Sequence, residues 1–599
     1  MSVRAVLESR GAEFGYNKSF PNQSFGYCGY YVRTASWRSV GDRSGPTVSL
    51  LEDRVSRRSS GSLSTGSARI ATLFLGFVTL PIIFRLLGPA EFGDYSVLLS
   101  AFAFYAILVS SGIVDGVRNS LEAERSIADW EPYVVGYYLR LALLFALTGA
   151  FVLVFLSRNG YVATLFGDTY TSYVYGLAIL GVSVQFQLYS RETLAGLGLQ
   201  GHAESLGVLE KVAFAVVAIP LLALGFGVPG ALVGHAVASI ICGAIGLVAI
   251  HQHVSLSSVL RIPPREFPRT ELLAVNSVSV VLLFLFALLY HVDILLLHQF
   301  RESAAVGNYR AALFVAELLW FVPIALQAVP TRSTPALWAR DRVEELAPLA
   351  PKTTRYTALL TAVVAVILGA LADTLVPIYF GSDATPAIGP LLVLLPGALG
   401  FALARPVFAA SKAEDAVRYP IAATAGAAGI TVVLNILLIP PYGMYGAAVA
   451  TTIGYGSMFV FHVLAARRIG FDPLAGARLG RVAATTALAA VPIFALATVV
   501  VNPWLALLLV PLFGLFIALV FAVLTGTIAP SEPFELLAAL PEPIGPRAEP
   551  IRRRLEDVNG DLTAVGWFQS MLFLAGITLL LSGILLATFG PDTGVPVFG

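Results

Sequence analysis

Few ionisable residues interrupt the long apolar runs of this sequence, and Glu317 lies deepest within one of them. The run covers residues 307–329, so Glu317 comes ten residues after its start, or about 15 Å along a helix that rises 1.5 Å per residue. A charge left in hydrocarbon costs at least ~2.5–3.5 kcal/mol. We therefore expect Glu317 either to face a wet cavity, where it contacts a substrate, an ion or a proton, or to hydrogen-bond a neighbouring helix as a structural link.

Three arginines near the ends of apolar runs are candidates for binding an anionic substrate. Arg140 lies about two turns into one run, Arg405 lies five residues before the end of another, and Arg85 lies near the end of the first. A guanidinium binds phosphate oxygens through two parallel hydrogen bonds. Each side chain can instead reach the membrane interface and act only as an anchor. Facing a cavity, Arg140 and Arg405 would form a cationic entrance for a phosphate or pyrophosphate, with Arg85 on the release side.

A second group of candidates consists of Asp293 and His291, which we expect to close the outer end of the run 272–297, and His235, which lies a turn or two into the run 229–250. A carboxylate or an imidazole within the membrane can relay protons or hold a cation. An intramembrane histidine can also simply bond a neighbouring helix. We expect no metal site, because His251 and His253 stand at the edge of a run without further ligands nearby in the sequence.

The composition indicates that these residues lie in membrane-spanning helices. Hydrophobic residues make up 57% of the 599 residues and charged residues only 13%, and the mean hydropathy is +0.79. These values are typical of an integral membrane protein and not of a soluble domain. Apolar windows of about 18 residues recur along most of the chain, and alternation typical of strands is absent, which predicts an all-α membrane protein.

The hydrophobic pattern predicts fifteen membrane spans, of which 173–190 and 444–464 are the most interrupted by polar residues. The predicted spans are 70–87, 95–112, 133–156, 173–190, 206–224, 229–250, 272–297, 307–329, 356–379, 386–410, 419–439, 444–464, 482–500, 504–525 and 566–588.

The distribution of basic residues predicts how these spans are oriented. Ten of the 38 basic residues precede the first span, and most of the others lie in alternate loops, whereas the loops between these hold only Arg158, Arg301 and Arg310. Lysine and arginine concentrate on the cytoplasmic side of membrane proteins. We therefore expect a multi-pass protein of the cytoplasmic (cell) membrane with its amino terminus in the cytoplasm and, after fifteen spans, its carboxy terminus outside.

Residues 1–65 contain no recognisable targeting signal. Their Ser-, Gly- and Arg-rich composition indicates either a disordered tail or a wrongly chosen start codon. Cys28 lies in this tail and Cys242 lies within a span, so a disulfide between them is not expected.

Two short echoes indicate an internal duplication. Phe92-Gly93-Asp94-Tyr95 recurs as Val306-Gly307-Asn308-Tyr309, 214 positions later, and Gly230-Ala231-Leu232-Val233 recurs as Gly446-Ala447-Ala448-Val449, 216 positions later. Each echo stands at the outer start of an even-numbered span. The spacing predicts two six-helix lobes in a parallel repeat, related by an axis along the membrane normal, as in transporters whose lobes move around a central site. The predicted domains are a tail (1–65), two lobes (66–253 and 270–468), two additional helices (480–525), a cytoplasmic loop (526–563) and a fifteenth membrane helix (564–589).

The first of these motifs resembles the corner of the polysaccharide (O-antigen) flippases in the multidrug/oligosaccharidyl-lipid/polysaccharide exporter superfamily. The resembling residues are Arg85-Leu86-Leu87-Gly88-Pro89 through Tyr95, and Val306 through Glu317-Leu318-Leu319-Trp320 to Pro330. The resemblance covers roughly 67–525 and implies a transport fold of fourteen spans. It also matches Glu317 to an acidic site that recurs in the family.

The resemblance and the buried charges together lead us to expect a flippase rather than an enzyme. Its substrate would be an oligosaccharide linked to a polyprenyl or dolichyl (pyro)phosphate, moved through the bilayer by alternating access. Because unpaired hydroxyl groups lose several kcal/mol in an apolar medium, a sugar chain needs such a polar path. Glu317, Asp293, His291 or His235 would couple the cycle to a proton or sodium gradient. We expect no cofactor and no nucleic-acid partner.

Two alternatives remain open at this stage. A drug or cation antiporter of the same superfamily would need a cluster of acidic residues in one lobe, whereas the acidic residues here are scattered. A membrane polysaccharide polymerase or ligase would need a large catalytic outer loop, and no loop predicted to lie outside exceeds about 16 residues. The sequence contains no GxxxxGK[ST] motif, which excludes a P-loop ATPase on this chain.

Overall fold

The structure is a computed structural model. It describes residues 48–123, 129–254, 277–321, 346–411 and 418–528, together with 259, 262–264, 267–269, 272 and 323. The predicted tail up to residue 47, the loop 529–563 and the fifteenth span lie outside the described residues. Within them the chain is helical without strands, as the composition predicts.

The helices follow one another with short connections. The first half of the described chain contains α2 (Val48–Glu122), α3 (Trp130–Arg158), α4 (Tyr161–Phe166), α5 (Asp168–Gly196), α6 (Gln200–Ala223) and α7 (Gly227–His251). The second half contains α10 (Ser277–Phe300), α11 (Ser303–Glu317), the 3₁₀ turn η1 (Leu318–Trp320), α14 (Leu346–Ala370), α15 (Ala372–Phe380), η3 (Ser382–Ala387), α16 (Ile388–Ala410), α17 (Arg418–Tyr442), α18 (Met444–Ile469), α19 (Leu479–Val499) and α20 (Pro503–Leu524).

The long element α2 is two helical arms that meet at a corner. Gly88 has φ 71° and ψ 171°, which is not helical and which a side chain would disfavour. Pro89 follows at once, with the fixed φ and missing N–H that suit the first turn of a helix. The first two predicted spans are therefore joined by one glycine-proline corner.

Eleven segments of the described residues are long and apolar enough to cross a membrane. Ala71–Ser110 accounts for the first two predicted spans. The predicted fourth span lies in α5, which has the length but is too polar to be counted. Of the predicted eighth span, 307–329, the structure describes 307–321 and 323, which include the end of α11 and η1. The predicted ninth span, 356–379, is interrupted at Leu371 between α14 and α15.

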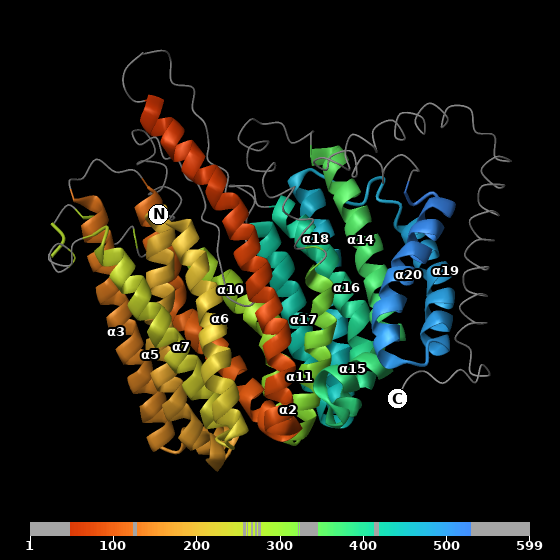
Figure 1. Cartoon of the computed structure of the whole chain (residues 1–599), viewed down its shortest axis with the longest axis horizontal. Coiled ribbons are helices and arrows are strands. Elements are labelled where there is room, and N and C mark those ends of the chain that lie inside the picture. Colours follow the sequence, from red (N-terminus) through yellow and green to blue (C-terminus); the bar gives the residue numbers. More distant parts are fainter. Residues whose placement is uncertain are drawn as a thin grey trace, which may run out of the picture.

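The helices form two groups, with α3, α5, α6 and α7 on the left of Figure 1 and α14, α16, α18, α19 and α20 on the right. In the first group, α5 and α7 pack together, with α3 against α5 and α6 against α7. In the second, α18 packs between α16 and α17, α10 packs on α17, and α14 lies against α16 and α19. The bend of α2 (red) and the helix α15 lie toward the lower edge of Figure 1. We call this the outer end, because the charge pattern predicts that it is extracellular.

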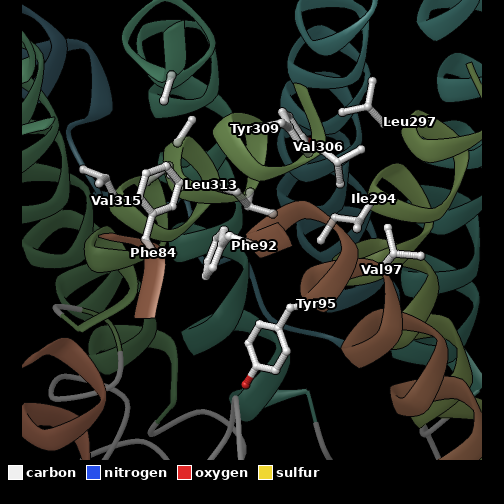
Figure 2. Close-up of a cluster of buried hydrophobic side chains, with 14 of the residues drawn as sticks. Phe84, Phe92, Tyr95, Val97, Ile294, Leu297, Val306, Tyr309, Leu313 and Val315 are labelled. Atoms are coloured by element: carbon white, nitrogen blue, oxygen red, sulfur yellow. The ribbon is translucent and has the colours of Figure 1, made fainter. Parts of the chain in front are cut away.

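A buried apolar cluster joins α2 to the second group. Figure 2 shows Phe92 and Val97 of α2 beside Ile294 and Leu297 of α10 and Val306 and Leu313 of α11. All six side chains are at most 2% exposed. Burial of this kind stabilises by roughly 25 cal/mol per Å² where the alternative is water, and it fixes α2 against α10 and α11 near their outer ends.

Candidate functional site

The carboxyl group of Asp293 is completely buried where α10, α11 and α18 meet. Its Oδ2 accepts hydrogen bonds from the hydroxyl of Tyr309 (2.6 Å) and from that of Thr451 (3.1 Å). Its Oδ1 accepts one from the backbone N–H of Ile294 (2.8 Å). Because α10 continues to Phe300, Asp293 lies seven residues inside the helix rather than closing its outer end, as the sequence suggested.

An ion pair lies on one face of the neighbouring helix α11. Arg310 Nη1 is 3.2 Å from Glu317 Oε1, and the two side chains are 20% and 21% accessible. Two turns separate them, so they share the face that also carries the partly buried Phe314. Helix α11 packs against α2, α10 and α16. Both side chains are therefore only partly enclosed by the surrounding helices.

The depth of Glu317 differs from the sequence expectation. The helix starts at Ser303, four residues earlier than the predicted span. Glu317 therefore lies about 21 Å along the helix from its outer start at 1.5 Å per residue, and the chain tightens into η1 directly after it. Glu317 is thus the last α-helical residue before a change of helix type.

His291 extends this group on α10. It packs edge-on against Tyr290 and against Phe104 of α2, and its Nδ1 is buried without a hydrogen-bond partner. The structure thus places Asp293, His291 and Glu317 on two adjacent helices, and Arg310 interacts electrostatically with all three. We call these four residues the charged cluster.

Sequence reasoning missed Arg310, which it assigned to an outer loop. The signal was present as the spacing of seven residues between Arg310 and Glu317, which puts two opposite charges on one helical face. It was overlooked because the predicted span began at residue 307, so that Arg310 counted as a boundary residue.

His235 takes part in a separate polar contact in the first group of helices. Its Nε2 lies 2.6 Å from the hydroxyl of Tyr95, and its ring stacks on Phe214 with the ring centroids 3.8 Å apart. Glu210 and Lys211 form an ion pair (3.2 Å) in the middle of α6, close enough to interact electrostatically with His235. Sequence reasoning also missed this pair, because it stood near the start of a predicted span.

The two polar contacts occupy matching positions of the repeat. Tyr95 corresponds to Tyr309 at the offset of 214, and His235 corresponds to Thr451 at the offset of 216. Tyr95 bonds His235, and the hydroxyls of Tyr309 and Thr451 lie 3.1 Å apart. The two-lobe arrangement stays a proposal, which these matched contacts support.

The three candidate arginines lie in different surroundings. The Nη2 of Arg140 donates to the backbone carbonyl of Val259 (3.0 Å), and the side chain is exposed. Arg85 is also exposed and donates to the carbonyl of Ile378. Neither is brought to the charged cluster by the contacts described.

Arg405, in contrast, is 8% exposed and lies against an aromatic group. Its Cζ is 5.6 Å from the ring centroid of Phe401, a distance at which a guanidinium is attracted to a ring face. Phe401 contacts Trp320, Tyr455 and Tyr290. Because Tyr290 adjoins His291, Arg405 is connected through aromatic rings to the charged cluster.

The described residues contain no group of three or more His, Cys, Asp or Glu side chains able to hold a metal ion. Cys242 is buried, and its thiol lies 3.6 Å from the carbonyl oxygen of Leu206.

Comparisons with known proteins agree with this architecture. A family described as "Polysaccharide biosynthesis protein" matches residues 59–330, which confirms the resemblance that the motifs indicated. No curated protein sequence matches significantly. A solved structure of the lipid II flippase MurJ in an inward closed conformation aligns with a TM-score of 0.60 at 14% identity, over 78% of this chain and 98% of that one.

A second solved structure is an inward-facing multidrug resistance MATE family transporter of the MOP superfamily. It aligns with a TM-score of 0.55 at 16% identity, over 66% of this chain and 94% of that one. At such identities the likeness shows the fold. The chain is a helical membrane protein with a MurJ/MATE-like fold, and these two neighbours are described as a flippase and a transporter.

Proposed function

We propose that this protein is a flippase that moves an oligosaccharide linked to a polyprenyl or dolichyl (pyro)phosphate across the cytoplasmic membrane by alternating access. The charged cluster on α10 and α11 carries the proposal. Asp293, His291, Arg310 and Glu317 lie deep in a helical bundle, and two of them keep about a fifth of their side-chain surface accessible. Charges are retained within membrane helices mainly where they serve a pathway or a relay.

The charged residues have distinct roles in this proposal. Arg310, and Arg405 across the aromatic group, supply positive charge for the phosphate of the carrier. Glu317 competes with that phosphate for Arg310, so substrate binding frees its carboxylate. Asp293, with Tyr309 and Thr451 around it, holds the proton or sodium ion that couples the cycle. Arg140 and Arg85 serve at the two entrances.

The lipid part of the substrate needs no polar path. Its chain stays in the bilayer while the sugars cross between the lobes 66–253 and 270–468. The two halves meet along α2, which packs against α10 and α11 of the second half as well as against α5 and α6 of its own.

The alternative of a drug or cation antiporter rests on the likeness to the MATE transporter and on the buried carboxyl of Asp293. Deleting the gene and locating the lipid-linked glycan separates the two functions. A flippase predicts that the glycan accumulates on the inner leaflet. Unchanged glycan together with lost resistance to cationic drugs supports the antiporter and contradicts our proposal.

The same experiment addresses the third alternative, a polymerase or ligase. Loss of such an enzyme leaves the lipid-linked units on the outer leaflet, in unpolymerised or untransferred form. Accumulation there contradicts a flippase equally clearly.

A further inference from the structure

Two arginines converge at the inner end of α19 and α20, which is the end opposite the outer end defined above. The two helices pack side by side at the right of Figure 1. Nη1 of Arg478 and Nη1 of Arg481 each donate a hydrogen bond to the backbone carbonyl of Gly526, and both distances are 3.0 Å. The two nitrogens are thus no further apart than twice this distance. Both side chains are exposed, so two accessible positive charges face one neutral acceptor.

A single arginine would satisfy this carbonyl. Gly526 has φ 65° and follows the last turn of α20, where one nearby cation is favourable. A second guanidinium at the same oxygen adds repulsion between like charges. Neither arginine forms an ion pair within the described residues, whereas the paired cations at other inner helix ends, Arg118, Arg191 and Arg467, lie 3.0–3.1 Å from a carboxylate oxygen. An anion bound between the two guanidinium groups would remove this repulsion.

Three threonine hydroxyls hold the two helix ends together beside the arginines. Those of Thr485, Thr525 and Thr527 form a closed ring of hydrogen bonds of 2.6–2.9 Å, and Thr485 also donates to the backbone carbonyl of Arg481 (2.9 Å). Thr485 and Thr527 are completely buried. Because the ring joins the first turns of α19 to the residues after α20, it fixes the backbone that carries both arginines. Side chains on a fixed backbone lose less conformational entropy when they bind a ligand.

Arg481 also heads an exposed apolar stripe on α19. Leu488 and Val491 are 50% and 73% exposed, and their spacing of seven and ten residues from Arg481 places them on the same side of the helix. They lie about 10 and 15 Å from Arg481 along the helix axis, toward the middle of the membrane. The charge pattern predicts that the arginine end is cytoplasmic. The guanidinium groups therefore lie at the level of the lipid headgroups, and the stripe lies along the acyl chains.

We propose that Arg478 and Arg481 bind the phosphate of an anionic phospholipid in the inner leaflet, and that an acyl chain of this lipid packs along Leu488 and Val491. Each guanidinium has five N–H donors, of which one contacts Gly526, so further donors remain for phosphate oxygens. The amino end of α19 adds the positive end of its helix dipole. Basic residues clustered at the cytoplasmic end of membrane helices are suited to anionic headgroups.

The position of the stripe favours a lipid over a free phosphate ion. An anion in solution would gain only the charge contact, whereas a phospholipid also keeps its chains against Leu488 and Val491. A phospholipid held in this way ties α19 and α20 to the inner leaflet.

The test measures lipid binding by the purified full-length protein in a neutral detergent. Native mass spectrometry counts bound dioctanoyl-phosphatidylglycerol as its concentration rises, with dioctanoyl-phosphatidylcholine as the neutral lipid. The variant Arg478→Gln/Arg481→Gln removes the pair, and glutamine can still donate to the carbonyl of Gly526. The matched control is Arg467→Gln/Arg468→Gln, which removes the same charge from the inner end of α18.

The proposal predicts that the parent and the control bind one phosphatidylglycerol in preference to phosphatidylcholine. The apparent Kd should rise about fivefold for each arginine removed, the effect expected of one basic residue near an anionic headgroup. The single variant Arg481→Gln leaves Arg478 on the carbonyl, so it reports on the site even if the double variant does not fold. Equal Kd values in the arginine variants and the control would overturn the proposal.

Three further probes identify the occupant. Inorganic phosphate that competes as well as the lipid would indicate a site for a free anion, and tighter binding of a short-chain polyprenyl phosphate would indicate a site for the carrier lipid. Lipid binding that appears only after Glu532→Gln/Glu535→Gln would show that carboxylates of the following segment occupy the arginines. Each of these results contradicts the proposal. Binding is measured without transport, so its outcome is separate from that of the proposed function.

Discussion

Replacing Glu317 and Arg310 singly and together separates a structural role of their ion pair from a role in transport. The substitutions Glu317→Gln and Arg310→Gln keep approximate size, and each single variant removes the ion-pair partner of the other residue. The double variant removes both charges. A double-mutant cycle on these four proteins isolates the interaction between the two side chains.

The structure sets the size of the interaction. Two unit charges 3.2 Å apart attract by about 5 kcal/mol at an effective dielectric constant of 20. About a fifth of each side chain is accessible, so solvent screening reduces this value. We expect a coupling free energy of about 1–2 kcal/mol, with the double variant more stable than the sum of the single changes predicts.

Two assays on the same proteins then give different answers. The free energy of unfolding in detergent or bicelles measures stability, and translocation of a lipid-linked sugar in vesicles measures function. If the pair serves transport, the double variant recovers stability but not translocation. Translocation near the parental rate in the double variant would refute a functional role and leave a structural link. Additive stability changes would refute the ion pair itself.

Three further predictions follow from the same helices. Tyr309→Phe should lower the free energy of unfolding by about 1–3 kcal/mol, because it leaves the buried carboxyl of Asp293 short of one hydrogen-bond donor. The matched variant is Tyr95→Phe, measured by the same unfolding titration. A smaller loss of unfolding free energy in Tyr309→Phe than in Tyr95→Phe would contradict this. Asp293→Asn should fold yet remove the dependence of transport on a proton or sodium gradient, tested by dissipating each gradient in turn; gradient dependence equal to the parent would exclude Asp293 as the coupling residue. Arg405→Lys keeps the charge but loses the planar contact with Phe401, so translocation should fall several-fold at limiting substrate and recover at saturation; an unchanged concentration dependence would place Arg405 outside the binding path.

The fold class was predictable from sequence because hydrocarbon imposes a simple rule. A helix must stay apolar for about 18 residues to cross the bilayer, and most predicted spans coincide with helices of the structure. The failures occur where this rule weakens. Polar residues make α5 fall short of the hydropathy of a span, although it is a continuous helix of 29 residues. The interruption at Leu371 has little effect on mean hydropathy, because Asp373 and Thr374 are flanked by long apolar stretches on both sides.

The candidate site was predictable only in part, for a related reason. Glu317 and Asp293 stood out as acids within apolar runs. Arg310 and the pair of Glu210 and Lys211 did not. Their helices begin before the apolar runs do, so charges that lie well inside each helix stood close to the start of the predicted span. The partner of a charge depends on helix packing, which hydropathy does not report. The contact of Arg405 with Phe401 follows from their i,i+4 spacing on one helix, a pattern that was open to sequence reasoning.

The short sequence repeat predicted two residues, Gly93 and Gly307, that lie where the backbones of α2 and α11 come into contact. Matches of four residues often arise by chance, yet Gly93 and Gly307 meet at a contact that leaves no room for a side chain. Their identity is fixed by the approach of two backbones. Asp94 and Asn308, one position further, differ because only one of them faces a hydroxyl.

Translocation by the purified protein tests the central claim most directly. The protein is reconstituted into vesicles that contain a short-chain polyprenyl diphosphate carrying a single fluorescent sugar, and an impermeant reductant quenches the label on the outer leaflet. Our account predicts that nearly all of the label becomes accessible with the parent protein, and only the outer half in empty vesicles or with the Arg310→Gln/Glu317→Gln variant. Protection of half the label by folded parent protein, under either a proton or a sodium gradient, would contradict it.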